Sequence, residues 1–193
     1  MPDAEVRHVF RDGLGIAILG GQVSGNLEVL DFDKPGVFDD WRQLVDDQSP
    51  GLVDRLPLVE TPDGGRHLFY RCSEIGGSAK LAMAREPYAK ASGKTSLVVI
   101  EIKGEGGYVL APPSPAECHA AGRPYVQIAG PELPAIPEIT PAERRLLLRS
   151  ARSFDEVPRT TVTGPPPSPD RRGPDLRPGD DYNARAQWRD ILV

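Results

Sequence analysis

Short apolar segments, rich in branched and aromatic residues, recur along the chain and predict β-strands. They are 15–19, 27–33, 56–60, 66–71, 95–103, 108–111 and 125–129. Turn-forming residues separate them. The segment GGQVSGN predicts a hairpin between the first two strands. The segment GEGG predicts a second hairpin, in which 108–111 pairs back onto 95–103.

Two further segments predict helices. The apolar residues of 36–48 recur near helical spacing, which predicts a short helix. A second helix is expected to start after Thr140, which precedes a proline and has Glu143 three residues on, and to end near Arg152. The mixed composition of 72–94, with several glycines, predicts a loop.

The order of strands, helix, strands and helix, without regular βα alternation, predicts an α+β fold with a mainly antiparallel sheet. Residues 1–155 are expected to form one domain. The proline-rich segment 156–179 predicts an extended or disordered linker. Residues 180–193 predict a helical tail whose apolar positions need a partner.

The composition, with 39% hydrophobic and 26% charged residues, is that of a soluble globular protein. No apolar run approaches the roughly 20 residues that cross a bilayer, and the amino terminus lacks the order of a secretory signal, so a cytoplasmic protein is expected. The two cysteines form neither a disulfide framework nor a zinc spacing.

The net charge of −5 argues against a general electrostatic grip on nucleic acid. Residues 1–140 carry 13 Lys and Arg against 20 Asp and Glu, whereas residues 141–193 carry 10 against 8. An acidic body is compatible with nucleotide chemistry when a divalent metal and a few local cations meet the phosphates.

Two carboxylates, Asp31 and Asp33, end the strand 27–33 and belong to one face, roughly 7 Å apart along the chain. Unpaired carboxylates at such positions repel each other and resist desolvation. A divalent metal such as Mg²⁺, which prefers oxygen ligands, resolves this. The alternative is that the two residues merely end a strand and cap a turn, since this spacing is common by chance.

A third acid, Glu101, lies within the strand 95–103. If its face meets the one that carries Asp31 and Asp33, three carboxylates converge. Two metal ions about 4 Å apart could then activate a hydroxyl and stabilise a leaving pyrophosphate. The alternative is a solvated stripe that Glu101 forms with Lys103 on the same face.

Nearby basic residues could contact phosphates. Alternation places His67 and Arg71 on one face, where the two side chains could hold triphosphate oxygens through charge-assisted hydrogen bonds. Arg66 flanks the histidine, and Lys80 and Lys103 are further candidates. Each of them could equally be a surface residue.

Three segments in order resemble the motifs of the archaeo-eukaryotic primase superfamily, and most closely the bifunctional primase/polymerase (prim-pol) domains of phages, plasmids and mobile elements. The acid-x-acid motif corresponds to Asp31 and Asp33 in NLEVLDFD. The motif of a small residue, any residue and His corresponds to GRH at 65–67. The acid after a hydrophobic residue corresponds to Glu101 in VIEIKGEGGYVLAPPS.

This likeness covers about residues 14–155 and implies an RRM-like antiparallel sheet packed with helices. It implies synthesis of primers or DNA strands from nucleoside triphosphates on a single-stranded DNA template, with two ions of Mg²⁺ or Mn²⁺. It assigns metal binding and catalysis to Asp31, Asp33 and Glu101, and nucleotide binding to His67, Arg66, Lys103 and Arg71. The tail 177–192 is similar to the junction that joins such domains to a helicase-type ATPase, so a helicase is an expected partner.

The sequence departs from the family pattern in two ways. Only about a dozen residues precede the first expected strand, where family members usually carry several tens, so elements that help hold template or primer are expected to be missing. The third motif often has Asp in place of Glu101, and Glu ligates the same ions with a longer reach.

Three functions remain as hypotheses. The leading one is a DNA-directed nucleotidyltransferase. The second is a non-catalytic module that binds nucleotide or single-stranded nucleic acid, which the acidic body favours because a template groove normally needs basic residues. The third is a nuclease or nucleotide hydrolase that uses the same acids with water as the nucleophile.

Overall fold

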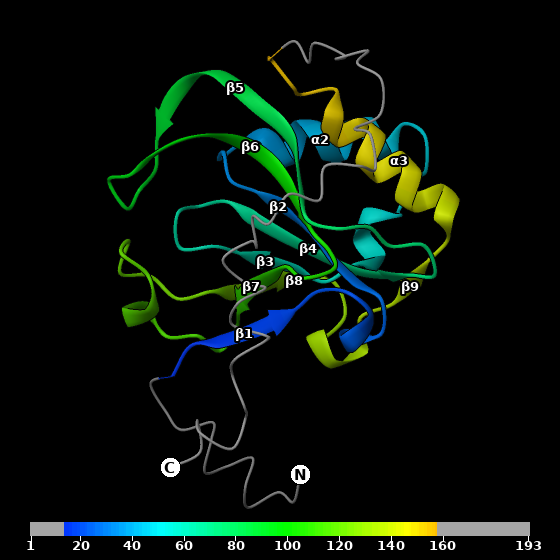
Figure 1. Ribbon diagram of the computed structural model, residues 1–193, viewed down its shortest axis with the longest axis horizontal. Coiled ribbons are helices and arrows are strands. Elements are labelled where there is room, and N and C mark those ends of the chain that lie inside the picture. The colour runs from blue at the N-terminus through cyan, green and yellow to red at the C-terminus, as the bar shows by residue number, and fades with distance from the viewer. Residues whose placement is uncertain (1–13, 158–193) are drawn as a thin grey trace, which may run out of the picture. The chain divides into compact units, whose positions relative to one another are not determined.

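The computed structural model describes residues 14–157, in which two sheets pack together and helices cover one face of the larger sheet (Figure 1). The strands are β1 (Ile16–Leu19), β2 (Leu27–Phe32), β3 (Leu58–Glu60), β4 (Arg66–Cys72), β5 (Ala79–Ala89), β6 (Thr95–Lys103), β7 (Tyr108–Ala111), β8 (Val126–Ala129) and β9 (Glu138–Ile139). The helices are α2 (Val37–Asp46) and α3 (Pro141–Arg152), with 3-10 turns η1 (Gln22–Ser24), η2 (Val53–Arg55), η3 (Ala116–Cys118) and η4 (Leu133–Ala135). The predicted α+β class with a mainly antiparallel sheet is confirmed. None of these helices is both long enough and apolar enough to cross a membrane.

The larger sheet has the strand order β5-β6-β2-β4-β3-β8, and the short β9 pairs in parallel with β4. β2 therefore lies inside the sheet, between β6 and β4. Its register places Leu30 opposite Leu68 on one side and Ile102 on the other. All six residues of β2 are buried, because neighbouring strands and packed layers on both faces surround it.

One face of the sheet carries the larger core, which α2 and α3 cover. The alternation of β2 sends Leu30 and Phe32 to this face. The Phe32 ring packs 4.8 Å from that of Trp41 on α2, measured between ring centroids. The indole Nε1 of Trp41 donates a 3.3 Å hydrogen bond to the carbonyl oxygen of Leu147, which links α2 to α3.

A buried ion pair fixes α3 to the same face. Glu28 is fully buried, and its carboxylate accepts hydrogen bonds of 2.6 and 2.7 Å from the guanidinium of Arg144 on α3. The Tyr70 hydroxyl and the Gly76 backbone N–H also donate to it, at 3.0 and 2.8 Å. A buried carboxylate is tolerated when such partners satisfy it.

The opposite face carries a second, smaller core. Leu27 and Val29 of β2 point to this side and pack with Phe69 of β4. The separate two-stranded sheet of β1 and β7 supplies Val109 and Ala111 to the same core. One end of the face is therefore covered, and the functional residues described below lie at the other end.

Both predicted hairpins are wrong. β1 pairs with β7, with Ile16 opposite Ala111, and only a single bridge between Gly21 and Leu27 links the first turn to β2. β6 pairs with β5 and β2 instead of β7. We attribute the difference to burial: the second apolar face of the sheet must be covered, and β1 and β7 cover it together.

The predicted loop over 72–94 is also wrong, since Ala79–Ala89 within it form the edge strand β5. Its pairing with β6 shifts register between Lys80 and Ala82 and again between Ala82 and Met83. Such irregularities break the two-residue period from which strands are recognised. The two-residue strand β9 was likewise not expected.

The predicted helices are confirmed. α3 begins with a capping box in which the Thr140 hydroxyl accepts from the Glu143 backbone N–H while the Glu143 carboxylate accepts from the Thr140 N–H. α2 spans nearly the expected range, and its buried residues are Phe38, Trp41 and Val45. The expected linker beyond 157 and the helical tail lie outside the described residues.

Candidate active site

A row of three functional side chains crosses the middle of the sheet. Asp31 on β2 is directly opposite His67 on β4 and, on its other side, directly opposite Glu101 on β6. Directly opposite residues in antiparallel strands place their side chains on one face, 4.5–5.5 Å apart at Cβ as a rule. The alternation that sends Leu30 to the helices sends Asp31 to the other face. The structure thus brings the first, second and third sequence motifs together.

Asp33 lies just past the end of β2. Its backbone N–H donates a 3.0 Å hydrogen bond to the carbonyl oxygen of Val99, which holds it beside β6. Its carboxylate oxygen lies 2.6 Å from Nζ of Lys90. Burial and the negative charges of Asp31 and Glu101 raise its pKa above the usual value, and Lys90 offsets only part of this. The negative charges therefore act on one another across the site.

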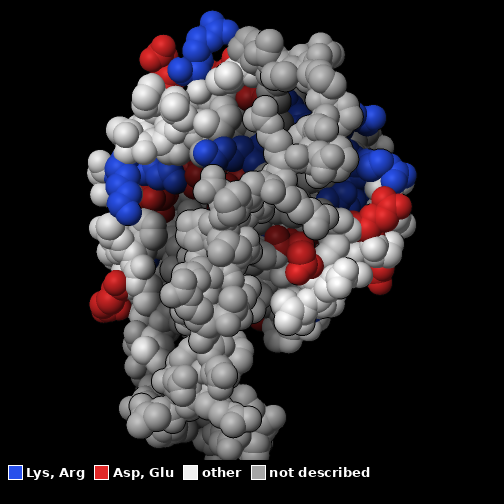
Figure 2. All heavy atoms as spheres, viewed as in Figure 1, with Lys and Arg blue, Asp and Glu red and all other residues white. Residues whose placement is uncertain are grey.

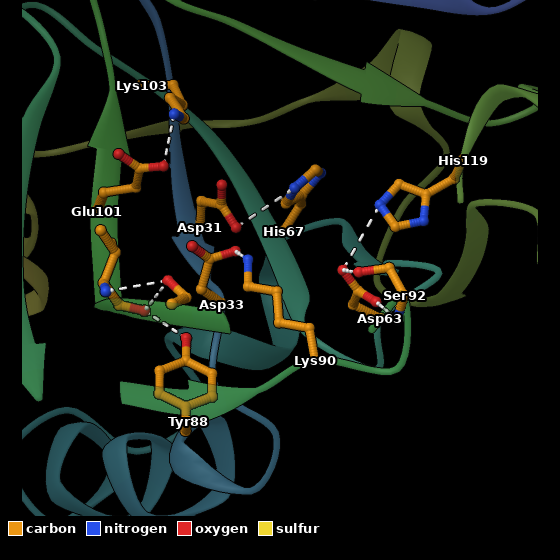
Figure 3. A network of polar contacts seen from close by, with 12 residues as sticks. Asp31, Asp33, Asp63, His67, Tyr88, Lys90, Ser92, Glu101, Lys103 and His119 are labelled. Atoms are coloured by element: carbon orange, nitrogen blue, oxygen red, sulfur yellow. Dashed lines mark hydrogen bonds and ion pairs between the residues drawn. The ribbon is translucent and has the colours of Figure 1, made fainter. Parts of the chain in front are cut away.

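Each of the three acids has its own basic partner in the protein (Figure 3). Nε2 of His67 lies 3.4 Å from Oδ1 of Asp31, a pair that is ionic only when the ring is protonated. Nζ of Lys103 lies 2.5 Å from Oε1 of Glu101. With the pair of Asp33 and Lys90, every acid of the cluster has a basic side chain beside it.

The charges around Asp31 shift its pKa in the opposite direction to that of Asp33. Burial raises the pKa of Asp31, but the positive charges of His67, Lys103 and Lys90 and the His67 hydrogen bond outweigh burial, so the net pKa is lowered. Burial also acts to lower the pKa of Lys103, but its hydrogen bond and charge interaction with Glu101 raise it overall. Asp31 is therefore held as a carboxylate and Lys103 as an ammonium.

The imidazole of His67 is held by aromatic rings and has one free nitrogen. It stacks on Tyr125 with centroids 5.9 Å apart and an interplanar angle of 30°, and it meets Phe69 edge-on. Its side chain is 7% exposed. Nδ1 is buried and has no hydrogen-bond partner. An unsatisfied buried nitrogen is costly in a folded protein and is a place where a ligand can bind.

An open pocket of about 470 Å³ lies over these residues. Its lining residues are Asp31, His67, Ser78, Lys103, Gly106, Gly107, Tyr108, Val109, Leu110 and Tyr125. The Tyr108 side chain stands largely exposed at this pocket. The volume is within the range of small-molecule sites, and its charged lining residues come from β2, β4 and β6.

The donor chemistry fits a divalent metal, but the present geometry is not a finished metal site. Asp31, Asp33 and Glu101 offer the oxygen ligands that Mg²⁺ and Mn²⁺ prefer. Within residues 14–157, however, no group of three or more His, Cys, Asp or Glu side chains is arranged to hold a metal ion. The three carboxylates instead contact His67, Lys90 and Lys103.

A second polar network lies beside the row (Figure 3). Asp63, in the turn between β3 and β4, accepts hydrogen bonds of 2.6 and 3.1 Å from the backbone N–H and the hydroxyl of Ser92. Nε2 of His119 lies 3.6 Å from the Asp63 carboxylate. This network ties the β5–β6 turn, which carries Lys90, to the loop that leads into β4.

Two of the predicted nucleotide-binding residues lie away from the row. Arg66 belongs to the opposite face of β4, where its guanidinium contacts Glu60 and donates to the carbonyl oxygens of Gly64 and Gly65. Arg71 shares the His67 face but lies four residues farther along β4, opposite Leu27. Its guanidinium donates to the carbonyl oxygens of Ser24 and Gly25. Both arginines thus hold turns.

Lys80, the remaining candidate cation, lies on β5 opposite Glu101 in the register and is exposed. On the surface that Figure 2 shows in colour, basic and acidic side chains lie next to one another instead of forming a single basic stripe. The basic residues that contact the acids are therefore single local ones.

Sequence reasoning missed Lys90, Tyr125 and Asp63. A signal for Lys90 exists: AKASGK before the strand at 95 is a turn sequence, and a hairpin there places Lys90 at the same end of the sheet as Asp33. It was lost because the preceding strand was read as a loop. Nothing local marks Tyr125, whose contact with His67 depends on how β8 joins the sheet.

Comparison with known protein families matches residues 2–143 to the family described as "Bifunctional DNA primase/polymerase, N-terminal". Among curated proteins, no match to the chain is found. The matched range covers most of the chain and includes the row of Asp31, His67 and Glu101. The chain therefore belongs to the family of bifunctional DNA primase/polymerase N-terminal domains.

Proposed function

We propose that the protein is a DNA-directed nucleotidyltransferase that adds nucleotides from NTPs or dNTPs on a single-stranded DNA template, in the replication of a phage or other mobile element. The observation that carries this proposal is the register of the sheet, which puts Asp31 between His67 and Glu101 under an open pocket. The chain belongs to a family of primase/polymerase domains, and this row joins the three segments that resemble the motifs of such domains.

The three carboxylates are proposed as the ligands of a divalent metal. Asp31, Asp33 and Glu101 would hold Mg²⁺ or Mn²⁺, which when bound supplies Lewis-acid activation of a 3′-hydroxyl and neutralises charge on the triphosphate. Support comes from the donor set and from the raised pKa of Asp33, since burial and the charge of Asp31 disfavour a second bare carboxylate there. That unfavourable charge is what a divalent ion would compensate.

The nitrogen donors of His67 and Lys103 are proposed to bind the incoming nucleotide. The free Nδ1 of His67 is suited to a phosphate oxygen, because a charge-assisted hydrogen bond would satisfy a buried group that now has none. The Lys103 ammonium lines the same pocket and can stabilise charge that develops on the phosphates. Tyr125 keeps the imidazole plane in place.

Incorporation of a labelled nucleotide on primed and unprimed single-stranded DNA, with Mg²⁺ or Mn²⁺, tests this function. Asp31→Asn should lose at least about a hundredfold in rate, because it removes a carboxylate charge at the centre of the row. Asp54→Asn is the control, since that carboxylate is exposed and pairs with Arg42 away from the row. Release of labelled monophosphate without extension would point to a phosphohydrolase instead. Nucleotide or DNA binding without any product would point to a binding module.

A further inference from the structure

Lys90 lies where Asp33 needs a positive charge. Of the three basic residues that contact the acids, it is the one that the sheet holds least firmly. His67 and Lys103 lie within strands of the sheet, whereas Lys90 lies in the turn between β5 and β6. Its ammonium is 2.6 Å from Asp33, and the two side chains are only 16% and 22% exposed. The same charge helps to lower the pKa of Asp31, so one lysine stabilises the charged form of two carboxylates.

The turn that carries Lys90 is built to place it there. The Lys90 N–H donates to the Lys94 carbonyl oxygen at 2.7 Å, and the Gly93 N–H donates back to the Lys90 carbonyl oxygen at 3.0 Å. The Asp63 carboxylate holds the same turn by accepting hydrogen bonds from the backbone N–H and the hydroxyl of Ser92. The backbone is thus held from two sides, while the four-carbon side chain above it keeps its own rotatable bonds.

The ammonium of Lys90 is one of three basic groups that contact the acids in place of a metal. Asp33 is turned to Lys90, and within residues 14–157 no three His, Cys, Asp or Glu side chains are arranged to hold a metal ion. A divalent ion would bring two positive charges, whereas Lys90 brings one. Removing its charge would leave Asp31 and Asp33 in mutual repulsion, which burial strengthens.

We propose that Lys90 is a built-in competitor of the divalent metal: its ammonium pairs with Asp33 when no metal is bound and leaves that carboxylate when the ion binds. This inference rests on the proposed function, because it takes Asp31, Asp33 and Glu101 as the metal ligands. Lys90 thereby stabilises the folded protein without metal but weakens its affinity for the metal. A neutral residue at this position should therefore lower the stability and raise the affinity.

Binding of Mn²⁺ to the full chain, followed by the electron paramagnetic resonance of the free ion, tests the proposal without any turnover. Lys90→Met keeps the length of the side chain and removes its charge, and it should bind Mn²⁺ about three- to tenfold more tightly than the wild type. Lys94→Met, an exposed lysine in the same turn, should leave the affinity unchanged. Lys90→Arg keeps the charge and can grip Asp33 with two donors, so it should bind no more tightly than the wild type.

Thermal unfolding provides a second readout with opposite signs. In EDTA, Lys90→Met should unfold at a lower temperature than the wild type, because Asp33 has lost its counter-charge. With saturating Mn²⁺ this deficit should shrink or reverse, since the ion that binds more tightly stabilises the folded state more. A merely structural lysine would lower the midpoint equally in both conditions.

Equal or weaker Mn²⁺ binding by Lys90→Met overturns the role of Lys90, and so does tighter binding by Lys90→Arg, because the effect would then not follow charge. Neither result touches the proposed function, which Asp33→Asn tests separately: it should abolish Mn²⁺ binding in either case. If the wild type and every variant fail to bind Mn²⁺, both the metal site and the competition are wrong.

Discussion

Asp31 and His67 are direct register partners on β2 and β4, and Nε2 of the imidazole lies 3.4 Å from Oδ1 of the carboxylate. The two residues are 9% and 6% exposed. One ring nitrogen is thus committed to the acid, while the other, Nδ1, is buried without a partner. His67 can therefore contact Asp31 through Nε2 and still bind a ligand through Nδ1.

The first prediction concerns the ring that stacks on this histidine. Tyr125→Ala should raise the KM for the nucleotide about two- to tenfold with little change in kcat, because loss of an aromatic contact costs about 0.5–1.5 kcal/mol and frees the imidazole to rotate. Steady-state incorporation kinetics measure both constants. Tyr125→Phe keeps the stacked ring and should behave as the wild type. A similar rise in KM for the phenylalanine variant would assign the effect to the hydroxyl instead.

The second prediction uses the raised pKa of Asp33. Burial and the charge of Asp31 raise this pKa in the folded state, so its protonated form favours folding below the unfolded value of about 3.9. That contribution is lost as pH rises through the folded pKa, and at neutral pH the ionised carboxylate opposes folding. Without metal, Asp33→Asn should therefore be more stable than the wild type at pH 7.

Urea unfolding in EDTA between pH 4 and pH 7 measures this difference. The advantage of Asp33→Asn should grow as pH rises above about 4. A constant difference across this range would show that the asparagine acts through packing or lost contact with Lys90 and not through ionisation. The same variant should lose nucleotide incorporation, so that stability and activity change in opposite directions.

The third prediction concerns Gly65, the small residue of the second motif. A Cβ on Gly65 would run into the backbone carbonyl oxygen of Phe32 and approach the Thr61 hydroxyl. Gly65→Ala should therefore destabilise the fold by about 1–3 kcal/mol and lower incorporation, because β2 and β4 must separate where Asp31 meets His67. Gly77→Ala is the control, since its Cβ would meet open space. Unchanged urea stability of Gly65→Ala would contradict the close approach of the two strands.

The fourth prediction separates the fold from the site. Arg144→Met leaves the fully buried Glu28 without its ion partner and should cost about 3–5 kcal/mol of unfolding free energy. Arg145→Met, next to it, removes only an exposed pair with Glu74 and should stay within about 0.5 kcal/mol. Below its unfolding midpoint, Arg144→Met should keep its incorporation rate, because the ion pair lies on the helix face. A rate that falls in parallel would couple that face to the site.

Much of the fold was predictable because its causes are local. The alternation of β2 alone separates Leu30 and Phe32 from Asp31, and the capping sequence after Thr140 alone begins α3. Where the local period is broken, the sequence does not predict the element: β5 is a strand with an irregular register, and its composition is typical of a loop. The hairpins failed for a different reason, since turn residues mark where a chain bends but not which strand it will pair with.

The sequence by itself determined which side chains share a face of each strand and which residues match the three family motifs. Only the tertiary structure decided that Asp31 stands between His67 and Glu101, because register across β4, β2 and β6 depends on contacts far apart in the chain. It also decided which cation meets which acid. Arg66 and Arg71 hold turns, whereas Lys90, from an edge hairpin, reaches Asp33. A side chain's chemistry is local, but its partner is set by the packing that buries both.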